Sequence, residues 1–82
     1  MPFSKELVAE LNLLTHFNLN TTHEGIKVHH TADPSTISSA TRLFSKGLIT
    51  QQHGGYLTSL GRDAAEHAQS TLDILQAQKI TT

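Results

Sequence analysis

The sequence contains no cysteine and no tryptophan, and only two prolines stand among its 82 residues. Without cysteine, neither a disulfide nor a thiolate metal site can form, so an apolar core alone must hold the fold together. No apolar run approaches the roughly 20 residues that cross a bilayer, and the N-terminus lacks the pattern of a signal peptide. We therefore expect a cytoplasmic protein with no membrane segment.

Charge is also scarce. Charged residues make up 16% of the chain, and the formal net charge is -1 with neutral histidines. A nucleic-acid-binding module usually carries a clear positive excess, so the charge count gives no support to DNA binding. Hydrophobic residues make up 37%, which is typical of a globular chain. The length predicts one domain spanning residues 1–82, with a core at about 4–76 and a frayed tail at 77–82.

The first predicted helix runs from about Ser4 to Phe17. Ser4 suits the N-cap position, and leucines recur after it at helical spacing: Leu7, Leu11 and Leu14. Residues 22–30 are open to two interpretations. The order Thr-Thr-His-Glu at 21–24 has the form of a capping box and predicts a short helix. The alternation in Ile26-Lys27-Val28 favours a short strand instead.

A second helix is predicted from Pro34 to Gly47. Asp33 suits the N-cap, and proline suits the first helical position because the N–H it lacks has no helical partner there. A buried stripe follows on one face of this helix: Ile37, Ala40, Leu43 and Phe44. Gly47 stands where a residue of left-handed conformation ends a helix.

A hairpin and a last helix complete the predicted order. Leu48-Ile49-Thr50 and Tyr56-Leu57-Thr58 are β-prone and flank a polar turn, in which Gly54 and Gly55 permit positive φ. Thr58 or Ser59 then caps a helix whose apolar residues extend to about Gln76: Leu60, Ala64, Ala68, Leu72 and Leu75.

The region from Pro34 to Ala68 resembles the second half of a winged helix-turn-helix domain of the MarR and PadR type. The matching elements are Lys46-Gly47-Leu48-Ile49, His53-Gly54-Gly55, Tyr56-Leu57-Thr58 and Gly61-Arg62. The whole chain also resembles a small family of uncharacterised gammaproteobacterial proteins that are labelled DNA-binding on fold grounds. These resemblances imply a mostly α fold with a small β-hairpin, a winged helix-turn-helix, and a role as a DNA-binding transcriptional regulator.

Under that resemblance, the outward face of the second helix enters the major groove. Its polar residues are Ser35, Ser38, Ser39, Arg42 and Lys46, and the wing adds Gln52 and His53. Arg42 is the side chain suited to a bidentate contact with guanine. The alternative is an ordinary solvated helix face, because the wing itself carries no Arg or Lys.

The sequence gives little support to a metal site or a catalytic site. His23, His29 and His30 lie close together in the sequence, but no carboxylate cluster completes a ligand set, so we expect no metal and no cofactor. Neither a Gly-x-Ser-x-Gly elbow nor an HExxH pair occurs, so we expect no enzyme.

A second function remains open beside DNA binding. The chain end carries more apolar surface than its position requires, in Leu72, Ile74, Leu75 and Ile80. If these side chains are exposed, the protein is a protein-interaction or dimerisation module that forms a homodimer through its terminal helices. If they are buried, they close the core of a very small domain.

Overall fold

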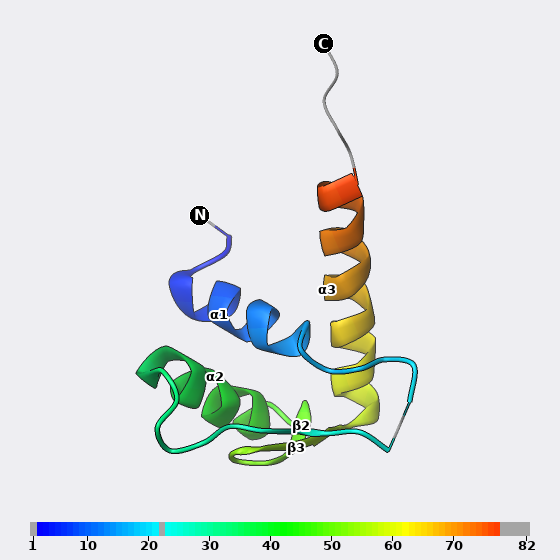
Figure 1. Cartoon of the computed structure of the whole chain (residues 1–82). Helices are drawn as coiled ribbons and strands as arrows, with labels where there is room; N and C mark the ends of the chain where they lie inside the picture. The colour runs from blue at the N-terminus through cyan, green and yellow to red at the C-terminus, as the bar shows by residue number, and fades with distance from the viewer. Residues whose placement is uncertain (1, 22, 78–82) are drawn as a thin grey trace.

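The computed structural model describes residues 2–21 and 23–77 (Figure 1). Within them, the elements follow in the order α1 (Lys5–Leu14), β1 (Ile26–Lys27), α2 (Pro34–Ser45), β2 (Ile49–Gln51), β3 (Gly54–Leu57) and α3 (Ser59–Ala77). The fold is therefore mostly helical with a small antiparallel sheet, as predicted at that level. Most of the tail for which fraying was predicted, residues 78–82, lies outside the described residues.

Helix α1 begins as predicted and ends one turn early. The Ser4 hydroxyl accepts a hydrogen bond from the N–H of Leu7 at 3.1 Å, which makes it the N-cap. The helix stops at Leu14, and the N–H of Phe17 donates to the carbonyl of Leu14 in a tighter last turn. Phe17 nevertheless stays in the core, where it is 5% exposed.

The helix that the capping box favours at residues 22–30 is wrong, and the strand alternative is confirmed. Ile26 pairs with Gly55 and Lys27 pairs with Gly54 in antiparallel register. The N–H of Val28 extends this pairing by donating to the carbonyl of His53 at 2.7 Å. The open edge of β3 supplies these backbone partners, and a helix at the same place would leave that edge uncovered.

Helix α2 matches its predicted start and end. Asp33 is the N-cap residue and Pro34 occupies the first turn, although the Asp33 side chain makes no capping bond. Gly47 has φ of 79° after the last turn, as expected of a left-handed helix terminator. One residue of the predicted stripe is misplaced: Phe44 is 43% exposed, because the core lies on the side of Ala40 and Leu43.

The three strands form one sheet in the order β1-β3-β2. Gln52 and His53 make the turn between β2 and β3, and Gly54 and Gly55 both have positive φ, as the hairpin prediction required. The pairing of β2 with β3 shifts register between Ile49 and Gln51. The predicted hairpin is therefore formed by β2 and β3. Strand β1, which follows α1 in the chain, pairs with β3 as a third strand.

Helix α3 is fixed at its first turn by Thr58 and Gly61. The Thr58 hydroxyl accepts from the N–H of Gly61 at 3.0 Å and donates to the carbonyl of Gly47 at 2.6 Å. A Cβ at Gly61 would lie 1.8 Å from the carbonyl oxygen of Leu48, so only glycine permits this approach. Leu60 lies outside the core, 58% exposed, contrary to its place in the predicted stripe.

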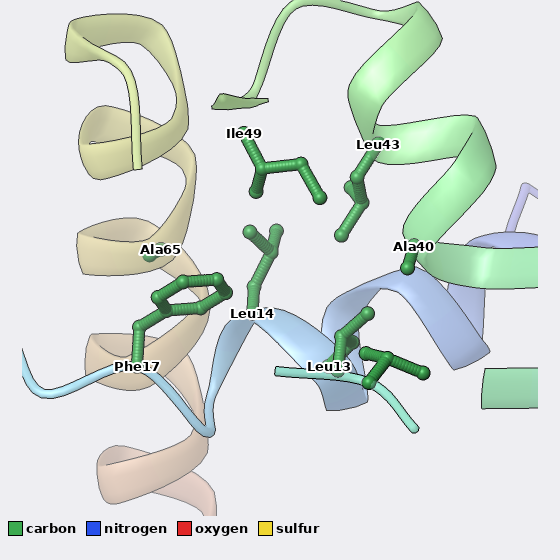
Figure 2. Close-up of a cluster of buried hydrophobic side chains, with 8 residues drawn as sticks. Leu13, Leu14, Phe17, Ala40, Leu43, Ile49 and Ala65 are labelled. Carbon is green, nitrogen blue, oxygen red and sulfur yellow. The ribbon is translucent and has the colours of Figure 1, made fainter. Parts of the chain in front are cut away.

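The core lies where the helices meet the sheet (Figure 2). Leu13, Leu14 and Phe17 come from α1 and its end, and they point toward side chains of the other elements. Those side chains are Val28, Ala40, Leu43, Ile49 and Ala65. Leu43 and Ala65 are completely inaccessible. This core is small, so much of each terminal helix is left with an uncovered face.

Candidate functional site

The residues predicted to contact DNA are not all on one exposed face. Ser35 and Ser38 are exposed on α2, and Gln52 and His53 are exposed at the turn of the hairpin. Ser39 is fully buried, so its predicted outward placement is wrong. Its hydroxyl donates to the carbonyl of Ser35 at 2.7 Å, one turn earlier in the same helix.

Arg42 and Lys46 also differ from the prediction, because both reach back to α1. The Nε of Arg42 donates to Oε2 of Glu10 at 2.9 Å, and the ammonium of Lys46 donates to the other oxygen of the same carboxylate. Arg42 further donates to the carbonyl of Glu6 at 3.3 Å and to the hydroxyl of Ser39 at 3.2 Å. Arg42 in α2 and Lys46 directly after it therefore clamp this helix to α1.

Glu10 stands at the centre of this clamp. It is 5% exposed, and burial raises the pKa of its carboxyl. The hydrogen bonds and positive charges of Lys46 and Arg42 lower that pKa by more, so it lies below the ordinary value. Glu10 is therefore charged at neutral pH and holds both cations in place.

The connection between α1 and α2 is long for a helix-turn-helix. In that motif a turn of about three or four residues joins the two helices. Here residues 15–33 stand between them, and these residues include β1. Helix α2 instead packs along α1, and the Glu10 clamp lies in that contact.

Of the remaining cations in the described part of the chain, Lys5 and Lys27 line hollows beside the first turn of α2, and Arg62 lies elsewhere. The guanidinium of Arg62 donates to the carbonyls of Leu19 and Thr21, both at 2.9 Å, and so fastens α3 to the segment before β1. Within residues 2–21 and 23–77, the ion pairs are those of Glu10, which leaves Lys5 and Lys27 outside any salt bridge. These two stand on different elements, α1 and β1.

A different surface is apolar and open. A groove of about 340 Å³ lies between α1 and α3. On each helix, its lining residues recur at intervals of three or four positions. Its lining residues are Phe3, Val8, Leu11, Asn12, Thr15, Ala64, His67, Ala68, Thr71, Leu72 and Leu75. No Lys, Arg, Asp or Glu is among them. The groove is thus an uncharged surface that presents mostly carbon atoms to solvent.

Helix α3 extends this apolar surface beyond the body of the molecule. It has 19 residues, or about 28 Å at 1.5 Å per residue, against 10 residues in α1. Its C-terminal half continues past α1 in Figure 1. Ile74 is 59% and Leu75 is 69% exposed there, as the interaction hypothesis required. Leu72 is half-buried in the groove wall.

Two negative findings apply to the described part of the chain. No helix there is both long and apolar enough to span a bilayer. No three or more histidine, aspartate or glutamate side chains come together there in a way that would hold a metal ion. His23, His29 and His30 are each exposed.

Comparison with known proteins places the chain in a family. A family model described as a family of unknown function, DUF5669, matches residues 1–76. The chain belongs to the DUF5669 family. No curated protein and no solved structure matches it. The family assignment therefore brings no activity with it, and the function must be argued from the geometry of this DUF5669 member.

Sequence reasoning missed Glu10, although a signal was present. Glu10 precedes Leu13 by three positions and Leu14 by four, so it shares the face of α1 that enters the core. A carboxylate on the apolar face of a helix requires a cation from elsewhere in the fold. The sequence does not say which cation, because Arg42 lies 32 residues away.

Proposed function

We propose that this DUF5669 protein is a non-enzymatic protein-interaction module, and that it forms a homodimer through the groove between α1 and α3. The observation that carries this proposal is the groove, which no Lys, Arg, Asp or Glu lines, with Leu75, 69% exposed, among its lining residues. Exposed leucine and isoleucine side chains beside an apolar groove offer surface that a partner can bury.

A second copy of the chain is the occupant that accounts for both uncovered features. Each protomer carries a groove and a projecting apolar helix end with Ile74 and Leu75. A two-fold axis pairs the same surface with itself, so the projecting end of each α3 packs in the groove of the partner. The small core adds a reason, since small domains often gain stability by association.

Sedimentation of the purified chain at increasing concentration tests this proposal. We expect the wild type to sediment as a dimer. Leu75→Asp places a charge in the apolar contact, which costs about 3 kcal/mol or more and weakens association by at least about a hundredfold. We therefore expect this variant to sediment as a monomer.

The matched control is Leu60→Asp, which makes the same change on the same helix. Leu60 is 58% exposed and lies outside the groove lining. We expect it to sediment as the wild type does. A wild type that stays monomeric at all concentrations, or an equal effect of both variants, would contradict the proposal.

A second candidate is DNA binding by the same scaffold, and two specific observations favour it. The strand order β1-β3-β2 presents a hairpin with Gln52 and His53 exposed at its turn, and Ser35 and Ser38 are exposed on α2. Against it stand the net charge of -1 and the use of Arg42 and Lys46 by Glu10. Phosphate contacts supply most of the affinity for DNA, and few cations are left to make them.

A mobility-shift assay with mixed-sequence duplex separates the two candidates. DNA binding predicts a retarded band at about 50 mM salt that weakens strongly by about 200 mM. A pure interaction module predicts no retention at either salt concentration.

A further inference from the structure

A second cavity lies between α1, β1 and α2, on the face of α1 next to the dimer groove, and Asn12 lines both. It has a volume of about 440 Å³, near the lower end of the range of small-molecule sites. Its walls come from α1, from β1 with the residues that follow it, and from the first half of α2. Three separate segments thus converge on one space, which neither the fold nor the dimer proposal uses.

The apolar part of the wall is aliphatic. Leu13 and Val28 line the cavity and are 6% and 7% exposed, so they form its inner surface. Ile26 and Ala32 line it as well and are half-buried. No Phe, Tyr or Trp is among the lining residues. A ligand for this wall carries a short aliphatic group.

The polar part of the lining favours a negative charge. Lys27 is exposed at β1, and its ammonium forms no salt bridge to any residue in the described ranges. Ser35 and Thr36 add hydroxyls at the amino end of α2, where the helix dipole attracts anions. His16 and His29 supply imidazoles to the same lining.

The ring of His16 is held in one orientation. Its Nδ1 lies 2.8 Å from the carbonyl oxygen of Asn12. A carbonyl oxygen can only accept, so Nδ1 carries the proton and Nε2 is left for another partner. A polar group on the lining is thus positioned by the backbone of α1.

One carboxylate, that of Asp33, is also in the lining. It belongs to the N-cap residue of α2, where the positive end of the helix compensates part of its charge. The formal charges of Lys27 and Asp33 balance, so the preference for a carboxylate rests on the ammonium of Lys27 together with the hydroxyls of Ser35 and Thr36.

From this set we propose that the cavity between α1, β1 and α2 binds a small aliphatic carboxylate. The carboxylate group meets Lys27 and the hydroxyls of Ser35 and Thr36, and the alkyl group lies against Leu13 and Val28. The proposal does not rest on dimerisation, because Asn12 is the single residue that lines both the cavity and the dimer groove.

Titration of the isotope-labelled chain with hexanoate, hexan-1-ol and hexylammonium, followed by amide NMR shifts, tests this proposal. We expect saturable shifts with hexanoate at residues 26–29 and at Asp33, Ser35 and Thr36, much weaker shifts with the alcohol, and none with the amine. Lys27→Gln weakens hexanoate binding by about fivefold, as expected for an exposed ion pair. Lys5→Gln, the same change at an exposed lysine outside this cavity, alters it less than about twofold.

Three outcomes would overturn the assignment. They are hexanoate shifts that do not saturate, alcohol binding as tight as hexanoate binding, and equal effects of Lys27→Gln and Lys5→Gln. Shifts confined to the residues of the α1–α3 groove would also reject this cavity and would instead report on the dimer surface.

Discussion

At the scale of single residues, Glu10 decides what α2 can do. A buried carboxylate is costly to leave unpaired, and here two cations from another helix surround it. Because Arg42 and Lys46 are partly exposed, water screens part of the attraction. The clamp therefore stabilises the α1–α2 contact moderately, and it directs both cations toward the protein instead of toward a ligand.

Glu10→Gln tests this account of the clamp. The variant keeps the shape of the side chain and removes its charge, so we expect the free energy of unfolding at pH 7 to fall by about 1–2 kcal/mol. Urea denaturation measures the change. Glu6→Gln, an exposed glutamate one turn earlier in α1, is the control and should change stability by less than about 0.5 kcal/mol.

The pH dependence of that difference follows from the direction of the pKa shift. The pKa of Glu10 is lowered in the folded chain, so its contribution is complete above the unfolded-state pKa of about 4.3. It is lost as the pH falls below that value toward the folded pKa. We expect wild type and Glu10→Gln to converge in stability in acid. A difference that stays constant down to pH 3 would show that the charge of Glu10 is not the cause.

At the scale of elements, local sequence signals predicted the helices α1, α2 and α3. The conformation of residues 23–30 depends instead on pairing with a strand far away in the sequence. Ser4 and Thr58 begin helices through side-chain hydrogen bonds to residues nearby in the chain. Pro34 and Gly47 mark the start and end of α2 through their backbone conformation, as expected. Residues 23–30 carry a local helix signal too, but their backbone pairs with β3, which comes much later in the sequence. A capping pattern involves neighbouring residues alone, so it does not show whether a distant strand will pair with the same segment.

In the predicted site, too, local periodicity predicted some side-chain positions and tertiary packing determined the others. Exposure of Ser35 and Ser38 follows from helical periodicity alone. The burial of Ser39 and the inward reach of Arg42 depend on where α1 packs, which periodicity in α2 does not contain. The groove was foreseen only as excess apolar residues at the chain end, because its other wall belongs to α1.

Thr58 links two elements, and its substitution should loosen both. Its hydroxyl accepts from Gly61 at the start of α3 and donates to the carbonyl of Gly47 after α2. We expect Thr58→Val, which keeps the shape but removes the hydroxyl, to lower the free energy of unfolding in urea denaturation by about 1–2 kcal/mol. Thr58→Ser retains the hydroxyl and should stay close to the wild type. Equal losses in both variants would mean that the methyl group, and not the cap, matters.

At the scale of the whole molecule, charge and apolar surface are separated. The ion pairs lie between α1 and α2, while the uncharged groove lies between α1 and α3. The long α3 carries that surface away from the sheet and the hairpin (Figure 1). A dimer formed there leaves the hairpin, the exposed end of α2 and the aliphatic cavity open in both protomers.

The most direct test of the dimer is an isotope-filtered NMR experiment on a mixture of labelled and unlabelled chains. It detects only contacts between different copies. We predict intermolecular NOEs between the methyl groups of Val8 or Leu11 on one protomer and those of Ile74 or Leu75 on the other. A mixed sample that shows none, or whose NOEs join Phe44, Tyr56 or Leu60 instead, would contradict the groove as the interface.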